Sequence, residues 1–474
     1  MPASPLTSVE SAPMSLERFA EVLHAEQYAA LRAGIEAAQP LFAGRTVWNV
    51  SSTADGGGVA EMLHTLLGYA RGAGVDARWE VIGGDGAFFA ITKRIHNHLH
   101  GFDGDGGALG ASELAAYRDS LRPSGEALLE KVRAGDVVIL HDPQTAGLVP
   151  LMRERGVSTI WRCHVGIDTP TEIVLEAWRF LLGFVAEADA AVFSRPSFVW
   201  DGIDPARTAI ISPSIDAFSP KNQLLGAGTV DGILAAAGVI AGGEGAAPEF
   251  VRMDGSTGTV ARRAVMTEGG PLRHGERFVL QISRWDALKD PAGVIAGFAE
   301  RVAPYSDAHL VYAGPDVSSV ADDPDGARVL ADVQQQFARL PSELRERVHL
   351  AVLPMADPQE NAAIVNALQH AASVVVQKSI AEGFGLTVAE AMWKARPVVA
   401  SRVGGIQDQI EDGRSGLLLD EPRELRQFGG AVLRLLDDHA GAERMGAAAR
   451  ERVRERFLGS DALLAYLRLV NRLS

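Results

Sequence analysis

Cysteine is almost absent from this 474-residue sequence, in which Cys163 stands alone. A single cysteine cannot form an internal disulfide, so a disulfide-built secreted domain is excluded and a reducing compartment is expected. No apolar run approaches the ~18 residues that a membrane helix needs, and the amino terminus lacks a basic start followed by an apolar stretch. We therefore expect a cytoplasmic protein that does not insert into a membrane.

Positive charge is also scarce. Lys and Arg number 45 against 60 Asp and Glu, a formal net charge of −15. This balance opposes binding to nucleic acid or to an anionic membrane through a generally positive surface, so any phosphate site must be local. The hydrophobic fraction of 47% and the charged fraction of 22% are ordinary for a globular protein. At ~150 residues per domain, the length predicts two large domains, or one domain with heavy elaboration.

Short β-branched runs, each followed by a turn and a segment with helical spacing, recur along the chain. The expected strands are 46–52, 77–82, 136–140, 158–163, 190–193, 208–211, 278–283, 309–313, 348–353, 374–377 and 397–400. Strand followed by helix many times over predicts an α/β protein with two doubly wound parallel sheets, facing each other across a central cleft.

The Gly- and Ala-rich segment 221–276 separates the two series of strands, so we expect a domain change near Pro271. The predicted divisions are an N-terminal domain over 1–270, with an elaboration at about 221–270, and a C-terminal domain over 271–455. A last helix over 456–474 could cross back to the N-terminal domain.

Three glycines, Gly56, Gly57 and Gly58, follow the first predicted strand and precede a helix. Bare N–H groups and the positive end of a helix at one point suit an anion. The stretch matches neither a P-loop nor the G-x-G-x-x-G dinucleotide pattern, and a simple tight turn is the alternative.

Two cations, Arg284 and Lys289, follow the predicted strand 278–283 and precede a helix opened by Asp290 and Pro291. A guanidinium fork and a compact ammonium could together hold a diphosphate without a metal. The alternative is a solvated loop in which Arg284 pairs with Asp286 or Asp290.

Two carboxylates, Glu382 and Glu390, flank a Gly-Phe-Gly-Leu turn. The turn and the start of the following helix comprise Gly383, Phe384, Gly385, Leu386 and Thr387. The free N–H groups of that helix start are expected to face an anion, with a carboxylate on either side for the hydroxyls of a sugar and of a ribose.

Together these motifs resemble the retaining glycosyltransferases of family 4, which have the GT-B fold of two Rossmann-like domains. The resemblance covers nearly the whole chain in order, and segments 49–63, 78–82, 141–144 and 161–164 are more narrowly similar to the trehalose glycosyltransferring synthases. Those enzymes join glucose from a nucleotide sugar to free glucose through an α,α-1,1 bond. The sequence departs from that pattern in the spacing from His164 to Asp168 and in a longer stretch at 254–275.

The resemblance implies that Arg284 and Lys289 bind the donor diphosphate and stabilise the leaving group. It assigns donor-sugar hydroxyls to Glu382, the ribose to Glu390 and contact with the base to Met355. The turn at Gly56, Gly57 and Gly58 would close against the diphosphate. No metal and no cofactor are expected, and the acidic stretch 322–325 is interpreted as an exposed loop or helix start.

For the N-terminal half, the resemblance implies that His164 touches the donor sugar near its reacting centre and that Asp142 binds sugar hydroxyls. Glu80, Lys93 and Asn97 are candidates for the acceptor pocket. Because no carboxylate pair is placed for double displacement, front-face substitution through an oxocarbenium-like state is predicted. The expected partners are a nucleotide sugar and a small sugar, and a homodimer stays open.

Other functions fit parts of the pattern. A retaining trehalose phosphorylase, or a family 4 transferase acting on another small hydroxyl, would keep the fold and the stereochemistry. An oxidoreductase or epimerase is opposed by the missing G-x-G-x-x-G. A catalytically silent nucleotide-sugar sensor is opposed by the presence of Arg284, Lys289, Glu382 and His164 together.

Overall fold

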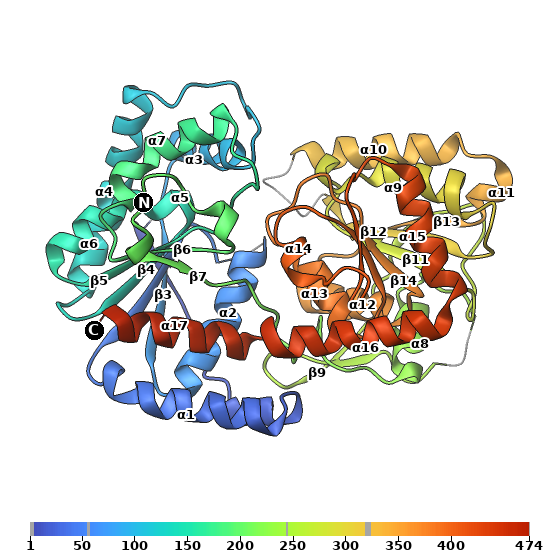
Figure 1. Ribbon diagram of the computed structural model, residues 1–474, viewed down its shortest axis with the longest axis horizontal. Coiled ribbons are helices and arrows are strands. Elements are labelled where there is room, and N and C mark those ends of the chain that lie inside the picture. The colour runs from blue at the N-terminus through green and yellow to red at the C-terminus, as the bar shows by residue number, and fades with distance from the viewer. Residues whose placement is uncertain (1–3, 55–56, 243–244, 318–323, 474) are drawn as a thin grey trace. The chain divides into compact units, whose positions relative to one another are not determined.

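The computed structural model describes residues 4–54, 57–242, 245–317 and 324–473 (Figure 1). It divides into two compact units, one of Met1–Ser214 with Phe457–Ser474 and the other of Ile215–Arg456. No helix among the described residues is long and apolar enough to cross a membrane. Each unit is built on its own seven-stranded sheet, as the alternating strand and helix pattern predicts.

The sheet of the first unit has the order β1-β3-β2-β4-β5-β6-β7. Its strands are β1 Leu6–Val9, β2 Thr46–Ser51, β3 Asp76–Ile82, β4 Val137–His141, β5 Ser158–Arg162, β6 Ala190–Phe193 and β7 Thr208–Ile210. Only β1 runs antiparallel to its neighbour. The remaining strands form a parallel, doubly wound sheet whose carboxyl ends share one edge.

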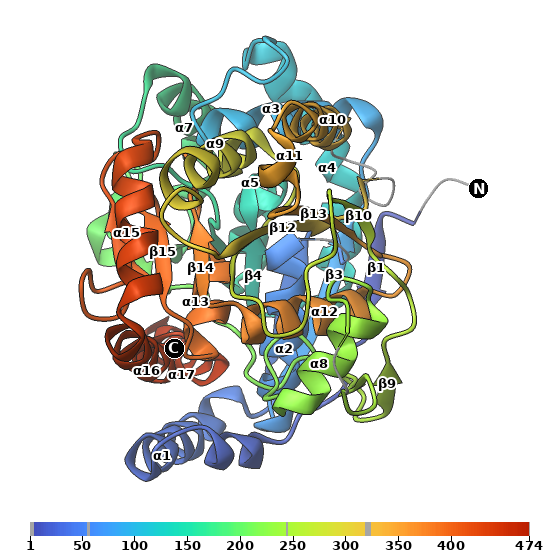
Figure 2. The same ribbon diagram turned by 90° about the vertical axis from the view of Figure 1, so that its right-hand side faces the viewer.

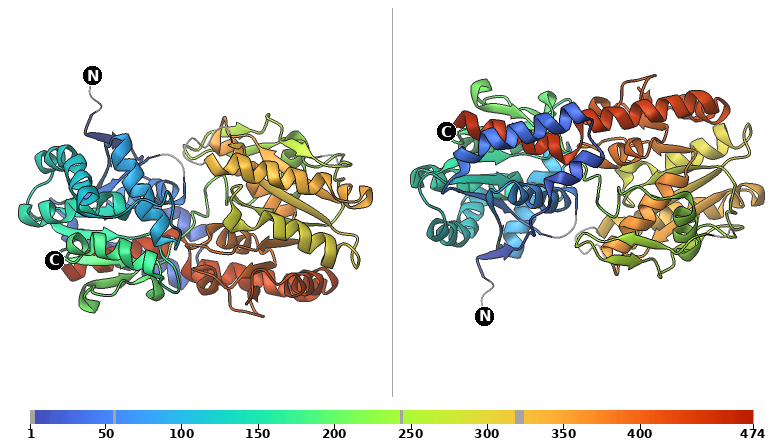
Figure 3. Two further views of the ribbon diagram at one scale, coloured as in Figure 1. Left: turned by 90° about the horizontal axis from the view of Figure 1, so that it is seen from above. Right: turned by 90° about the horizontal axis from the view of Figure 1, so that it is seen from below.

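Helices of the first unit are α1 Ala25–Phe42, α2 Gly57–Gly72, α3 Gly86–Leu99, α4 Ala111–Lys131, α5 Asp142–Thr145, α6 Val149–Arg155, α7 Glu172–Val185 and α17 Gly459–Leu473. α17 lies against α1 and α2 (Figure 3). Gly34 permits the close approach, because a Cβ atom there would lie 2.6 Å from Leu464 Cδ2.

The sheet of the second unit has the order β10-β13-β12-β11-β14-β15-β16. Its strands are β10 Val265–Thr267, β11 Phe278–Ile282, β12 His309–Pro315, β13 Val348–Leu353, β14 Val374–Gln377, β15 Val398–Ser401 and β16 Leu417–Leu419. All but β10 pair in parallel. A separate hairpin pairs β8 Glu249–Val251 with β9 Thr257–Thr259.

Helices of the second unit are α8 Ala227–Ala236, α9 Pro291–Gly297, α10 Pro324–Ala338, α11 Ser342–Arg345, α12 Pro358–Ala371, α13 Leu386–Trp393, α14 Ile406–Gln409, α15 Leu425–Asp437 and α16 His439–Arg456. Figure 2 shows this unit facing the viewer. Its core joins apolar residues of the central strands to α9, α10 and α15.

The division between the units differs from the predicted boundary near Pro271. Segment 215–270 belongs to the second unit, because it is fastened to α12 through polar contacts as well as through α8. Asn366 Nδ2 donates to the carbonyls of Pro220 and Gln223 at 3.1 and 2.8 Å. Buried Glu360 accepts from the N–H groups of Ala261 and Arg262, both at 2.7 Å. The composition of this segment suggested an elaboration and a linker. Its hydrogen bonds with α12 join residues far apart in the sequence, so they become evident only in the structure.

Replacing Glu360 by alanine is expected to destabilise the second unit by about 2–3 kcal/mol, because two backbone N–H groups and the Arg262 guanidinium lose a charged acceptor. Urea denaturation followed by circular dichroism would measure the free energy of unfolding. The matched control is Glu443→Ala, an exposed glutamate on α16, whose effect should stay within about 0.5 kcal/mol. Equal stability of the two variants would contradict the contacts described for Glu360.

Candidate active site

Lys289 stands in the loop between β11 and α9, as the sequence predicts. Its backbone carbonyl accepts from Gln281 Nε2 at 2.7 Å, which ties the loop to the end of β11. Asp290 then caps α9 by accepting from the N–H group of Gly293 at 3.1 Å. The loop is therefore held by the protein itself, which presets the position of the lysine.

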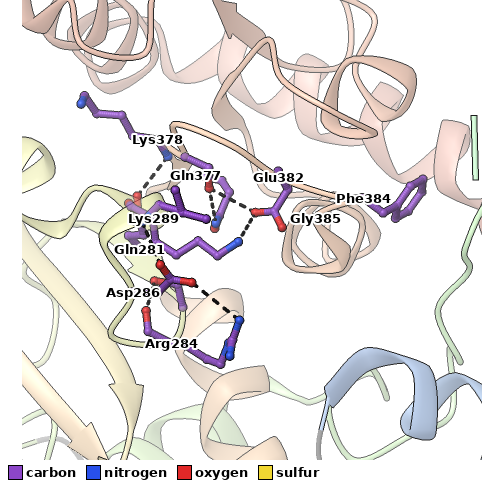
Figure 4. Close-up of polar contacts among 12 residues, drawn as sticks. Gln281, Arg284, Asp286, Lys289, Gln377, Lys378, Glu382, Phe384 and Gly385 are labelled. Carbon is purple, nitrogen blue, oxygen red and sulfur yellow. Dashed lines mark hydrogen bonds and ion pairs between the residues drawn. The ribbon is translucent and has the colours of Figure 1, made fainter. Parts of the chain in front are cut away.

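The Lys289 ammonium pairs with Glu382. Nζ lies 2.5 Å from Glu382 Oε2, and the hydroxyl of Ser379 donates to the same oxygen at 3.1 Å. The Lys289 and Glu382 side chains are 14% and 13% exposed, and they point toward each other in Figure 4. Two residues 93 positions apart thus meet at the carboxyl ends of β11 and β14, beside a surface that solvent still reaches.

Arg284 is the more exposed of the two predicted cations. Its side chain is 59% exposed, and Nη2 lies 3.6 Å from Asp286 Oδ2 (Figure 4). The local pairing with Asp286, considered above as the alternative for this residue, is therefore present. An exposed ion pair of this kind is worth little, so the guanidinium can turn toward an anion at small cost.

The turn before α13 is held by the conformation of Gly385 and by hydrogen bonds from segment 405–409. Gly385 has φ of +80°, a left-handed conformation that glycine adopts without strain. Gln409 Nε2 donates to the carbonyl of Phe384 at 2.5 Å, and the N–H group of Gly405 donates to Gly383 at 2.8 Å. Figure 4 shows the ring of Phe384 directed away from Lys289, and it is buried.

α13 begins at Leu386, directly after this turn, as predicted. The N–H groups at the start of a helix have no acceptor within the helix, so those of Leu386 and Thr387 are available to an anion. Glu382 precedes this helix start in the loop, so a carboxylate and a positive helix end occupy one region. That combination suits a ligand with a phosphate beside sugar hydroxyls.

Glu390 lies inside α13 and is only 5% exposed. Lys221 Nζ is 3.6 Å from Glu390 Oε1. The buried Lys394 ammonium donates to Asn222 Oδ1 at 3.2 Å and to the Glu390 carbonyl at 3.1 Å. Burial lowers the pKa of Lys394 to about 7, although the Glu390 carboxylate acts in the opposite direction.

Met355, the residue expected to contact the base, lies partly buried in the loop after β13.

In the first unit, Asp142 and His164 meet at the carboxyl ends of β4 and β5. Asp142 Oδ1 accepts from the N–H group of His164 at 2.8 Å, and the indole of Trp161 donates to the Asp142 carbonyl at 3.1 Å. Asp142 has φ of +65°, a strained conformation for a residue with a side chain. Burial raises the pKa of Asp142 to about 6, while the His164 N–H group and Arg162 oppose the rise.

The ring of His164 belongs to a chain of hydrogen bonds. His164 Nε2 lies 3.1 Å from His141 Nδ1, and His141 Nε2 lies 3.0 Å from Asn49 Oδ1. Arg162 Nε donates to His164 Nδ1 at 3.4 Å. With the amide oxygen of Asn49 and the Arg162 N–H at the two ends, both rings are neutral and each donates through Nε2. Both ring nitrogens of His164 therefore have hydrogen-bond partners within the protein.

Burial lowers the pKa of His141 to about 3, with a further contribution from Arg162. A folded-state pKa below the unfolded value of about 6.5 gives stability that is lost as the pH falls below 6.5. The stability advantage of the wild type over His141→Gln should therefore shrink by about 1.4 kcal/mol between pH 7.5 and pH 5.5. Urea denaturation of both proteins at the two pH values checks this, and a pH-independent difference would contradict a neutral His141.

Other predicted residues of this unit do not join the cluster. Glu80 is buried beside the edge strand, where Lys131 Nζ and the Ser8 hydroxyl bind its Oε1 at 2.7 and 2.9 Å. Lys93 is exposed on α3, and Asn97 lies near the end of the same helix.

The glycine turn is described only in part. Gly57 and Gly58 open α2, and Gly56 lies outside the described residues. Of the acidic stretch 322–325, Asp322 and Asp323 also lie outside them.

The sequence-based site missed several supporting residues. Asn49, His141 and Arg162 lie in segments 49–63, 141–144 and 161–164, which were noted for their resemblance, but none of the three was assigned to the site. Lys221 and Asn222 were assigned to the linker, and no spacing in the sequence connects them with Glu390. A polar residue at a strand end was the available signal for His141. For Lys221 there was none.

Comparison with known proteins identifies the families that the two halves of the chain match. Residues 49–200 match the family "Trehalose synthase, N-terminal domain", and residues 266–452 match "Glycosyl transferases group 1". A trehalose synthase of Rubrobacter xylanophilus is 35% identical over 91% of this chain and 91% of its own length. A trehalose phosphorylase of Grifola frondosa is 27% identical over 88% of this chain, but over 56% of its own length.

Among solved structures, a UDP-forming α,α-trehalose-phosphate synthase from Burkholderia xenovorans superposes with a TM-score of 0.65 at 14% identity, over 90% of this chain and 99% of that one. This likeness supports the fold. With two parallel-sheet units, and with a relative above 30% identity along most of its length, the chain belongs to the trehalose synthase group of the family 4 glycosyltransferases, which have the GT-B fold.

Proposed function

We propose that this glycosyltransferase of trehalose metabolism transfers glucose from a nucleoside-diphosphate-glucose to free glucose, forming α,α-trehalose with retention at the anomeric carbon. The observation that carries the proposal is the meeting of Lys289 with Glu382 at the start of α13. A cation, a carboxylate and a positive helix end at one place match a sugar joined to a diphosphate.

In this reaction Lys289 and Arg284 bind the diphosphate and stabilise the negative charge that grows on it as the glycosidic bond breaks. Glu382, released from Lys289 by the competing phosphate, accepts from donor-sugar hydroxyls, and Glu390 accepts from the ribose. Met355 adjoins the base. The two cations carry out the charge stabilisation that a metal performs in other transferases, so activity should persist in EDTA.

The first unit supplies Asp142, whose second carboxylate oxygen makes no hydrogen bond to any described residue. We assign this oxygen to a sugar hydroxyl. His164 acts through its backbone and by holding the ring network in place, because both of its ring nitrogens already have protein partners. This refines the expectation that the histidine itself touches the donor near the reacting centre.

The test is incubation of the protein with ADP-, UDP- or GDP-glucose and glucose. Release of nucleoside diphosphate together with a non-reducing disaccharide, identified as α,α-trehalose by NMR, is the expected result. The absence of both products with all three donors would overturn the proposal. Omitting glucose controls for simple hydrolysis of the donor.

A phosphorylase is the second candidate, because relatives named trehalose phosphorylase match most of this chain. In that reaction phosphate would take the place of the nucleoside diphosphate. Phosphate would attack trehalose to form glucose 1-phosphate and glucose, and in the reverse direction it would leave glucose 1-phosphate as trehalose forms. Formation of glucose 1-phosphate from trehalose and phosphate, without any nucleotide, would favour it. The same preparation assayed in both directions separates the two functions.

A further inference from the structure

The second unit contains a pocket at the opposite end of its sheet from Lys289 and Glu382. Its volume is about 410 Å³, within the ~300–1,000 Å³ usual for small-molecule sites. It is lined where β11 and β14 begin, by Phe278 and Ser373, and by the end of α12 and the face of α8. α8 and α12 lie side by side (Figure 2). The five residues of β11 separate the pocket from the donor site by roughly 16 Å.

Arg396 lines this pocket, and its charge is not balanced by a carboxylate. Nε donates to the Lys394 carbonyl at 3.3 Å and Nη1 to the Ala372 carbonyl at 3.4 Å. Nη2 has no hydrogen bond, and the guanidinium no ion pair, to any residue that the structure describes. Burial lowers the pKa of Arg396, which means that the cation lacks a compensating anion.

Further positive charge lies close to Arg396. His370 lines the same pocket, and its pKa falls to about 3, first through burial and then through the charges of Lys394 and Arg396. Its Nε2 is buried and unpartnered among the described residues. Arg450 packs over Trp393 and contributes to the same effect on His370. In a protein with a net charge of −15, the cations gathered around Arg396 favour an anion on that side of the pocket.

Two other polar residues of the pocket, Asp231 and Glu276, offer acceptors that are held in place. Asp231 Oδ2 lies 3.2 Å from His274 Nε2. Glu276 Oε2 accepts from the N–H group of Arg273 at 2.7 Å. Because both carboxylates are fixed by neighbours, they can accept from hydroxyl groups without first being reoriented. A ligand that binds Arg396 together with these two carboxylates therefore needs both an anionic group, a phosphate or carboxylate, and hydroxyls.

We propose that this pocket binds a small phosphorylated sugar, with the phosphate on Arg396 and the hydroxyls on Asp231 and Glu276. The site is separate from the one that binds the donor, and it does not depend on which reaction the enzyme catalyses. Lys394 links the two regions, since its carbonyl accepts from Arg396 and its ammonium lies beside Glu390.

Calorimetric titration of the full chain with glucose 6-phosphate, in the absence of any nucleotide sugar, tests the site. Arg396→Gln should weaken binding at least about tenfold, the usual loss for a hydrogen bond to a charged group. Ala227→Trp, which fills the pocket from an exposed position on α8, should do the same without removing a buried contact. Arg426→Gln, an exposed arginine on α15, is the matched control and should bind like the wild type.

Three further titrations distinguish binding in this pocket from binding in the active site and from binding of only part of the ligand. Asp142→Asn should bind glucose 6-phosphate as the wild type does, and loss of binding there would place the ligand in the active site and overturn the proposal. Glucose and inorganic phosphate should each bind at least about tenfold more weakly, because each satisfies one end of the pocket. Unchanged binding by both Arg396→Gln and Ala227→Trp, or equal binding of either fragment, would also overturn it.

Discussion

Replacing Lys289 by alanine is expected to lower the rate of glucosyl transfer about 100- to 1,000-fold, the usual loss when one preorganised donor to developing negative charge is removed. The ammonium lies in a fixed loop, is only 14% exposed and is held 2.5 Å from Glu382. The fixed loop thus positions the ammonium before the donor arrives, and donor binding only exchanges Glu382 for the phosphate as its partner.

Release of nucleoside diphosphate under saturating donor and acceptor measures this loss, with Lys289→Met as a second variant that keeps the length of the side chain. Lys289→Arg should lose less, because it keeps the charge but changes the geometry. The control is Arg328→Ala, whose side chain is 64% exposed on α10. If Lys289→Ala retained half of the wild-type rate while remaining folded, its role on the diphosphate would be ruled out.

Replacing Asp142 by asparagine should lower kcat/KM about 10- to 100-fold, because a charged acceptor for a sugar hydroxyl becomes a neutral amide. Asparagine is the appropriate substitution because it tolerates the left-handed conformation of this position, φ of +65°, better than alanine. The backbone geometry should therefore survive the change.

The free energy of unfolding of Asp142→Asn should not fall with its activity. Burial raises the pKa of Asp142 to about 6. For an acid with a raised pKa, stability is present at low pH and is lost as the pH rises through 6, so ionised Asp142 costs stability at pH 7. Asp142→Asn should therefore be at least as stable as the wild type at pH 7. A variant that loses activity and stability together would indicate a purely structural aspartate.

The same pKa sets the acidic limb of the pH profile. If the ionised carboxylate binds sugar, wild-type kcat/KM should decline as the pH falls below about 6. In Asp142→Asn that decline should disappear, because the group no longer titrates.

Most strands of the two central sheets were predictable because buried parallel strands are continuous apolar runs. The three-residue strands β10 and β16 were not predicted. β6, β13 and β14 begin and end where the sequence predicts. β1 was missed because only Leu6 of its four residues is buried, so it shows no apolar run. The β8-β9 hairpin was missed because its three-residue strands lie within a Gly-rich segment.

The donor-side residues were predictable to the extent that they follow strands. Arg284, Lys289 and Glu382 each lie in the segment that follows an apolar run, and parallel strands bring such segments to one edge of the sheet. The ion pair between Lys289 and Glu382 was not predictable, since spacing along the chain says nothing about which charged groups meet. The role of Glu80 at the edge strand was hidden for the same reason, because Lys131 and Ser8 lie 51 and 72 positions away.

The membership of α17 in the first unit has a consequence for biosynthesis. α17 supplies buried residues such as Leu463, Tyr466 and Val470, yet it is translated after the whole of the second unit. Domains generally fold as units during synthesis. The first unit, although begun earlier, therefore leaves the faces of α1 and α2 that pack on α17 uncovered until the whole of the second unit has been translated.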